Sequence, residues 1–259
     1  MADSAKKSDP LNITMSLGDH LEELRSRLIL SIAGLVAAFI LCIFFGRYII
    51  AFIEKPYVKI MGENARLQCL APADGFVVYM QIAMVAAIVI SSPWIFYQMW
   101  LFVSAGLYPN ERRYIYLAVP FSAGLFIAGA LLFVFEIAPV TLGFLVLFNK
   151  EFLGVESNFT FQNYISFMGI MMLVFGLAFQ TPIAIFFLNK IGIVSIDMLR
   201  RSRRYVILGI VIVAAAVIPG SDAISLFALA VPMYLLFELG IFLSYLSNRK
   251  SHRNITAGD

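Results

Sequence analysis

The chain has 259 residues and a net charge of +3, and 61% of its residues are hydrophobic while 14% are charged. Soluble domains are about 45–50% apolar and about 25% charged. So many apolar residues cannot all lie in one soluble core, which excludes an ordinary soluble enzyme and indicates a chain whose solvent is largely lipid. The net charge is too small to indicate nucleic-acid binding by itself.

Six stretches without charged residues predict six membrane-spanning helices. Only helices and closed barrels satisfy their backbone groups in lipid, and these runs are too continuous for the alternation of barrel strands. The predicted fold is therefore all-α, a single polytopic membrane domain over residues 1–259 with tails at 1–15 and 247–259. We expect its spans at about residues 28–50, 75–103, 114–136, 159–189, 205–218 and 223–246.

The charge-free stretches differ in length. Those at 75–110 and 157–189 exceed 30 residues, which is about 45 Å of helix. Each must therefore tilt, bend or leave the membrane, with Pro93 and Pro182 as natural kink points. The fifth, at 205–221, provides only about 21 Å of helix over 205–218, before Pro219 and Gly220 end it. Short helices beside long ones predict a concave, cupped arrangement and a locally thinned bilayer.

Lysine and arginine are divided unequally between the two sides of the predicted bundle. Fourteen of the 19 fall in the tails and in every second loop, which by the positive-inside rule predicts that both termini are cytoplasmic. The polar first ten residues predict no removable signal peptide. The other side carries Arg47, Lys55, Lys59, Arg66 and Lys150.

Cysteine and histidine are few and widely separated. Cys42 lies in the first span and Cys69 in the first outer loop, while His20 and His252 lie in opposite tails, so neither a disulfide nor a metal site is predicted. The sequence has no H-E-x-x-H and no G-x-S-x-G motif. We therefore expect no catalytic residue, no metal and no cofactor.

Two acidic residues stand out on the side predicted to be cytoplasmic. Glu23 lies on a helix predicted to begin after an N-cap at Ser16 and to run into the first span. One interpretation is that Glu23 pairs with Arg27 at i,i+4 in a solvated first turn, for about 0.2–0.5 kcal/mol. Glu111 lies in the loop between the second and third spans. The positive-inside rule accounts for the neighbouring Arg112 and Arg113, but it does not account for this acid.

Several motifs together resemble the TatC family, the multispanning subunit of the twin-arginine protein translocase. Residues 20–28, His-Leu-Glu-Glu-Leu-Arg-Ser-Arg-Leu, resemble its HLxELRxRL opening. The likeness extends from about residue 16 to 247 and keeps the order and spacing of all six spans. Its other motifs are Ser92-Pro93, Tyr97-Gln98-Met99-Trp100, Gly106-Leu107-Tyr108, Glu111-Arg112-Arg113, Phe175-Gly176 with Phe179 and Pro182, and Pro232-Met233-Tyr234 with Phe237-Glu238.

The resemblance implies a receptor that binds twin-arginine signal peptides through Glu23 and Glu111. Two fork-shaped guanidiniums match two carboxylates, whereas lysine offers only a point charge. The face predicted to be cytoplasmic carries fourteen basic and eight acidic residues, a balance of +6. Its overall field does not attract an arginine-bearing peptide, so the peptide must be recognised by a local acidic patch. Whether Glu22 takes the place of Glu23 stays open. The supporting residues that the resemblance implies are His20, Glu22, Arg25 and Arg27.

Polar residues at membrane depth form a second group of candidates. The resemblance places Gln180 where relatives commonly carry a glutamate that helps to dock a TatA or TatB subunit or responds to protonation. An amide keeps the hydrogen bonding but loses the titration. Glu238, near Tyr234, is either a helix-packing hydrogen-bond partner or a functional contact. Glu136 is interpreted as an interfacial residue at the outer boundary of the third span.

The resemblance also implies partners and a location. The partners are folded cargo with twin-arginine signal peptides, single-span subunits of the TatA and TatB types, and further copies of the chain in a homo-oligomeric receptor complex. The location is the lipid bilayer of the bacterial cytoplasmic (inner) membrane, with transport driven by the proton-motive force and no nucleic acid involved. In the outer loops the resemblance suggests Pro56 and Asp222 as candidate site residues. The alternatives are a small-solute secondary transporter, which inverted repeats and broken helices would favour, and a structural scaffold.

Overall fold

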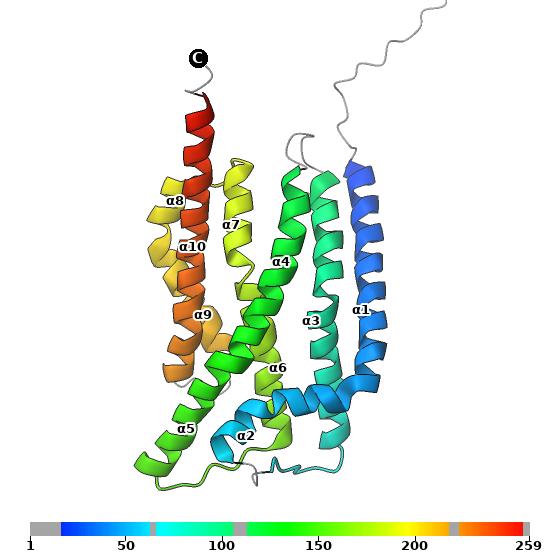
Figure 1. Ribbon diagram of the computed structural model, residues 1–259, viewed down its shortest axis with the longest axis vertical. Coiled ribbons are helices and arrows are strands. Elements are labelled where there is room, and N and C mark those ends of the chain that lie inside the picture. The colour runs from blue at the N-terminus through cyan, green and yellow to red at the C-terminus, as the bar shows by residue number, and fades with distance from the viewer. Residues whose placement is uncertain (1–16, 63–65, 106–112, 218–222, 256–259) are drawn as a thin grey trace, which may run out of the picture.

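The computed structural model describes residues 17–62, 66–105, 113–217 and 223–255 (Figure 1). Over these residues the fold is all-α, as predicted, with one isolated parallel β-bridge between Gln68 and Thr160. The elements in chain order are α1 (Leu17–Ile53), α2 (Lys55–Met61), α3 (Asp74–Ala105), α4 (Arg113–Leu132), the π-helical turn η1 (Phe133–Ile137), α5 (Ala138–Phe152), α6 (Phe161–Ala178), α7 (Thr181–Lys190), α8 (Ile196–Arg201), α9 (Arg203–Val217) and α10 (Ala223–Ile255).

Five helical stretches in the described part of the chain are long and apolar enough to cross a membrane. They overlap five of the six predicted spans. The remaining prediction, at 205–218, falls on α9, whose 15 residues make about 22 Å of helix against about 30 Å of hydrocarbon. A crossing by α9 and the cupped shape of the bundle both stay predictions. The five stretches are His20–Met61, Asp74–Ser104, Ala118–Phe152, Phe161–Lys190 and Leu226–Leu246.

The middle of the bundle is formed by α3, α4 and α6. Helix α1 packs along α3, and α10 packs against α7 and α9 (Figure 1). The main core consists of buried aromatic and aliphatic side chains, among them Ile82, Phe133, Tyr164 and Phe175. The outer surface is apolar too, since Phe44 on α1 is 76% exposed. Helices that are apolar on all sides are typical of membrane spans.

The first and the last described helix, α1 and α10, have their outer ends on the same side of the bundle. The start of α1 and the end of α10 are at the upper end in Figure 1, together with the end of α3 and the start of α4. This agrees with tails on the same side of a membrane. That this side is cytoplasmic stays a prediction.

The overlong fourth apolar stretch breaks into two helices, α6 and α7. The break follows Ala178, and Pro182 lies in the first turn of α7. Proline has no N–H to donate and its ring clashes with the carbonyl four residues earlier, so an α-helix cannot continue through it undisturbed. Pro93 has a smaller effect, because α3 continues through it as one helix.

Helix α1 is tied to α3 by two aromatic donors. The Trp94 indole donates to the Leu30 carbonyl at 2.9 Å, and the Tyr79 hydroxyl donates to the Ile43 carbonyl. Gly46 permits the second contact, since a Cβ there would lie 2.5 Å from the Tyr79 ring. A side chain inserted into the helical hydrogen-bond ladder is a known cause of bending. The last turns of α1 bend and, with α2, run across the lower end of the bundle (Figure 1).

Among the outer-loop candidates, Pro56 is buried in the first turn of α2, in the segment that crosses the lower end. The hydroxyl of buried Tyr164 on α6 holds this segment by donating to the Ile53 carbonyl at 2.7 Å. Asp222 lies outside the described residues, as does the N-cap predicted at Ser16.

Candidate functional site

The first turns of α1 lie beside the last turns of α3 at the upper end of the bundle (Figure 1). The ring of His20 on α1 packs against Phe102 on α3, with ring centroids 4.6 Å apart. Helix α3 ends at Ala105 and α4 begins at Arg113. The loop that joins them carries Glu111, which lies outside the described residues.

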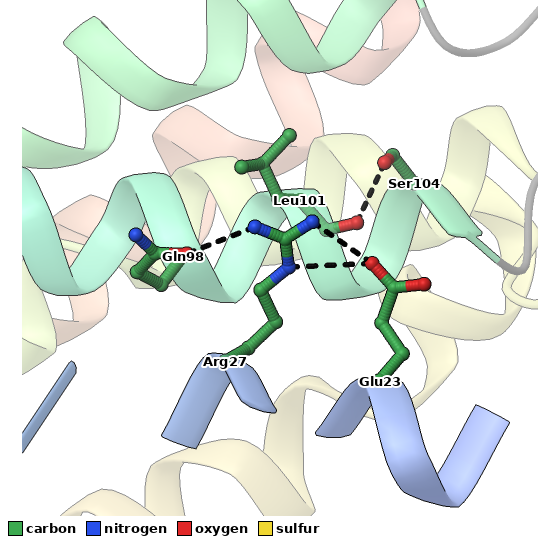
Figure 2. A network of polar contacts seen from close by, with 5 residues as sticks. All are labelled: Glu23, Arg27, Gln98, Leu101 and Ser104. Carbon is green, nitrogen blue, oxygen red and sulfur yellow. Dashed lines mark hydrogen bonds and ion pairs between the residues drawn. The ribbon is translucent and has the colours of Figure 1, made fainter. Parts of the chain in front are cut away.

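Glu23, Arg27 and Gln98 form a polar network between α1 and α3 (Figure 2). Arg27 donates from Nε and Nη2 to Oε1 of Glu23, at 3.2 and 3.0 Å. Its Nη1 donates to Oε1 of Gln98 at 3.2 Å. Residues four apart share one face of a helix, so Glu23 and Arg27 both face α3. The i,i+4 pair expected from the sequence is confirmed, and Gln98 adds a tertiary partner.

Burial makes this network stronger than an ordinary surface pair. The Glu23 and Arg27 side chains are 25% and 29% exposed, and Gln98 is only 2% exposed. A fully exposed ion pair contributes only about 0–1 kcal/mol, partly because two long side chains lose conformational freedom when they pair. The Arg27 guanidinium is already held by a buried amide, so it loses less freedom when it binds the carboxylate. The network therefore fixes the position of Glu23.

One carboxylate oxygen of Glu23 is left open by this arrangement. Both bonds from Arg27 go to Oε1, and Oε2 accepts no hydrogen bond from the residues that the structure describes. Figure 2 shows Oε2 on the side of the carboxylate away from Arg27. An added donor can bind there without breaking the network.

The other candidates on this part of α1 lie apart from the network. Glu22 and Arg25 are exposed. Glu22 and Ser26 line a shallow, open hollow together with Glu23 and Arg27. Glu23, and not Glu22, is the acid that faces α3.

The role of Gln98 was missed from the sequence, although it belongs to one of the family-like motifs. Its partner Arg27 is 71 residues away. The available signal was a polar side chain within an apolar, membrane-spanning run, which is by default a packing or functional contact.

Gln180 takes part in a second network, at the start of α7. Its Nε2 donates to the Ser122 carbonyl on α4 at 2.9 Å, and Trp100 on α3 donates from its indole to the Ser122 hydroxyl at 2.9 Å. Gln180 therefore ties the α6–α7 break to the middle of the bundle. Its amide acts here as a donor, which an ionised glutamate could not be.

Glu238 lies between two partners on α9 and α10. The Tyr234 hydroxyl donates to its Oε1, and Arg203 donates from Nη2 to its Oε2, both at 2.8 Å. The structure thus shows the helix-packing contact that was one of the two interpretations of Glu238. Glu136 is exposed within η1, and the helix continues beyond it to Phe152.

Comparison with known proteins identifies close relatives of the chain. The model of the family described as Sec-independent protein translocase protein (TatC) matches residues 19–232. The chain is 34% identical over 242 residues to the Sec-independent protein translocase protein TatC of Koribacter versatilis (strain Ellin345), covering 92% of this chain and 88% of that protein. It is 32% identical over 231 residues to the protein of the same name from Escherichia coli (strain K12), covering 89% and 88%.

A solved structure matches the fold as well. A crystal structure of the twin arginine translocase receptor TatC aligns with a TM-score of 0.79 at 31% sequence identity, covering 88% of this chain and 99% of that chain. The likeness therefore extends to almost the whole of the solved protein.

Proposed function

The chain belongs to the TatC family of Sec-independent protein translocase proteins, and from this membership we propose that it is the receptor for twin-arginine signal peptides in its translocase. It is a multi-pass membrane protein and a transport component rather than an enzyme. The proposed location is the bacterial cytoplasmic membrane with both termini in the cytoplasm. The shared end of α1 and α10 supports an even number of crossings.

The observation that carries the proposal is the fixed carboxylate of Glu23. Arg27 and Gln98 hold it against α3, and within the described part of the chain no donor occupies Oε2. An incoming guanidinium can bind Oε2, whose two lone pairs accept up to two bonds, while Arg27 keeps both of its bonds to Oε1. The second arginine needs a second acid, for which we propose Glu111 in the loop between α3 and α4.

The described start of α1 has little net charge to attract a peptide. Its charged residues Asp19, Glu22, Glu23, Arg25 and Arg27 sum to −1, so recognition depends on directed bonds. Hydrogen bonds to charged groups contribute about 1.5–3 kcal/mol each where water is partly excluded. The 25% exposure of Glu23 favours this range over the 0–1 kcal/mol that is typical of fully exposed pairs. Arginine brings several N–H donors in a rigid planar fork, whereas the ammonium of lysine is a strongly hydrated point charge.

We further propose that single-span subunits of the TatA and TatB types dock along α7, α9 and α10, and that several copies of the chain share one receptor complex. Exposed apolar side chains such as Ile207 and Leu235 lie on the same two helices, α9 and α10, as the Arg203–Glu238 pair, and they support such docking. The proton-motive force would drive the export of folded cargo by the assembled complex.

Photo-crosslinking of a twin-arginine signal peptide to the membrane-inserted protein tests the receptor assignment. Glu111→Ala should abolish the crosslink and Glu23→Ala should weaken it, while the protein stays inserted. Glu22→Ala is the matched control, because Glu22 is exposed and outside the network, and it should leave the crosslink intact. Unchanged crosslinking to both the Glu111 and the Glu23 variants would refute the site.

A further inference from the structure

The connection between α7 and α9 concentrates positive charge. Arg200, Arg201, Arg203 and Arg204 fall within five positions of α8 and the start of α9, and all four are exposed. The positive-inside rule explains the sign of these charges. It does not explain why two of them, Arg201 and Arg204, line one hollow.

Two of the four arginines have partners outside the hollow. Arg203 donates to Glu238 on α10 at 2.8 Å. The Arg200 guanidinium lies 5.8 Å from the centre of the Tyr245 ring, also on α10. Both contacts fasten the connection to α10 and leave Arg201 and Arg204 to face the solvent.

Arg201 and Arg204 line one hollow between α8 and α9. Arg204 stacks over the Tyr205 ring at 4.8 Å and donates to its hydroxyl at 2.9 Å. Arg201 makes no hydrogen bond, ion pair or ring contact with the part of the chain that the structure describes. Asp197 is the single acid in the lining, so two guanidiniums outweigh one carboxylate. The complete lining is Ser195, Asp197, Met198, Arg201, Ser202, Arg204 and Tyr205.

An exposed apolar stripe continues from the hollow along α9. Leu208 and Ile212 follow Arg204 at intervals of four residues, which places all three on one helix face. Leu208 is 57% and Ile212 59% exposed. Met198 and Tyr205 at the edge of the hollow are 58% and 62% exposed. A basic hollow that adjoins an apolar stripe is complementary to an anionic lipid, which has a charged headgroup and apolar acyl chains.

We propose that this hollow binds the phosphate of an anionic membrane lipid. Arg201 and Arg204 hold the phosphate, since guanidinium forks match phosphate oxygens bidentately. The acyl chains lie along Leu208 and Ile212. The stripe favours a lipid over free phosphate, because a free anion would leave it unused. The site is separate from the signal-peptide site and stands whether or not the receptor assignment holds.

Lipid titration of the purified full-length protein tests the site. The protein is held in phosphatidylcholine nanodiscs, phosphatidylglycerol is added in steps, and bound lipid is counted by native mass spectrometry. Arg201→Gln combined with Arg204→Gln should weaken phosphatidylglycerol binding about 30-fold, which corresponds to about 1 kcal/mol for each arginine at 1.4 kcal/mol per tenfold. Inorganic phosphate at millimolar concentration should not displace the lipid.

A matched control uses the opposite end of the bundle. Arg47→Gln combined with Arg66→Gln removes two exposed arginines and should leave the affinity within about threefold. Arg201→Lys combined with Arg204→Lys keeps the charge and the fold, and should fall between the parent and the glutamine variant because lysine lacks the fork. Equal weakening by the control pair, displacement by inorganic phosphate, or preferential binding of an acidic peptide would overturn the proposal.

Discussion

Replacing Gln98 by leucine tests whether this buried amide positions Arg27 and, through it, Glu23. Oε1 of Gln98 accepts a 3.2 Å bond from Arg27, and leucine has similar bulk but no acceptor. Because Arg27 is 29% exposed, water replaces part of the lost bond. We therefore expect the network that holds Glu23 to lose about 1 kcal/mol of stabilisation, less than the about 1.5–3 kcal/mol that is typical of hydrogen bonds to charged groups. Binding of a twin-arginine peptide should weaken about fivefold, since 1.4 kcal/mol corresponds to tenfold.

Gln81 provides a matched control on the same helix. Its Oε1 accepts a bond from the Ser166 hydroxyl on α6 at 3.1 Å, far from the proposed peptide site. Gln98→Leu and Gln81→Leu should both lower the midpoint of thermal unfolding by about 2–4 °C. Only Gln98→Leu should weaken peptide binding, which the fluorescence anisotropy of a labelled peptide measures. Equal peptide affinities for the two variants would refute the positioning role of Gln98.

Four further variants test the packing. Gln180→Leu should lower the free energy of unfolding by about 1 kcal/mol, because the Ser122 carbonyl loses its side-chain donor; unchanged thermal stability would contradict this. Gln180→Glu should be less stable at neutral than at acidic pH relative to the parent protein, since only the protonated acid can donate, and a flat pH profile would disprove it. Gly129→Ala should cost about 1–3 kcal/mol, because its Cβ would lie 2.7 Å from the Phe175 carbonyl oxygen, whereas Gly124→Ala, with nothing within 4 Å, should be neutral or stabilising.

The apolar runs predicted most of the helices because, in lipid, a charged residue usually marks the end of a span. The second span, expected at 75–103, corresponds to α3 at Asp74–Ala105. The rule is less informative at Glu136, where the charge-free run ends but the helix continues to Phe152. A single exposed carboxylate in a π-helical turn does not stop a helix when the following residues are apolar again.

The site was predictable only in its local part. A glutamate and an arginine four residues apart share a helix face, so the Glu23–Arg27 pair followed from spacing. The bond to Gln98 depends on how α1 packs against α3, which periodicity does not contain. Likewise, Glu238 could be recognised as a costly group at membrane depth, but its partner Arg203 became evident only once α9 was placed beside α10.

The most direct test of the receptor assignment compares two peptides on the purified full-length protein. One carries a twin-arginine signal sequence, and the other differs only by lysine at both arginine positions. We predict that the twin-arginine peptide binds at least about tenfold more tightly, and that Glu23→Gln removes most of this difference while Glu22→Gln leaves it. Equal affinities of the two peptides for the unaltered protein would contradict recognition of paired guanidiniums by this chain.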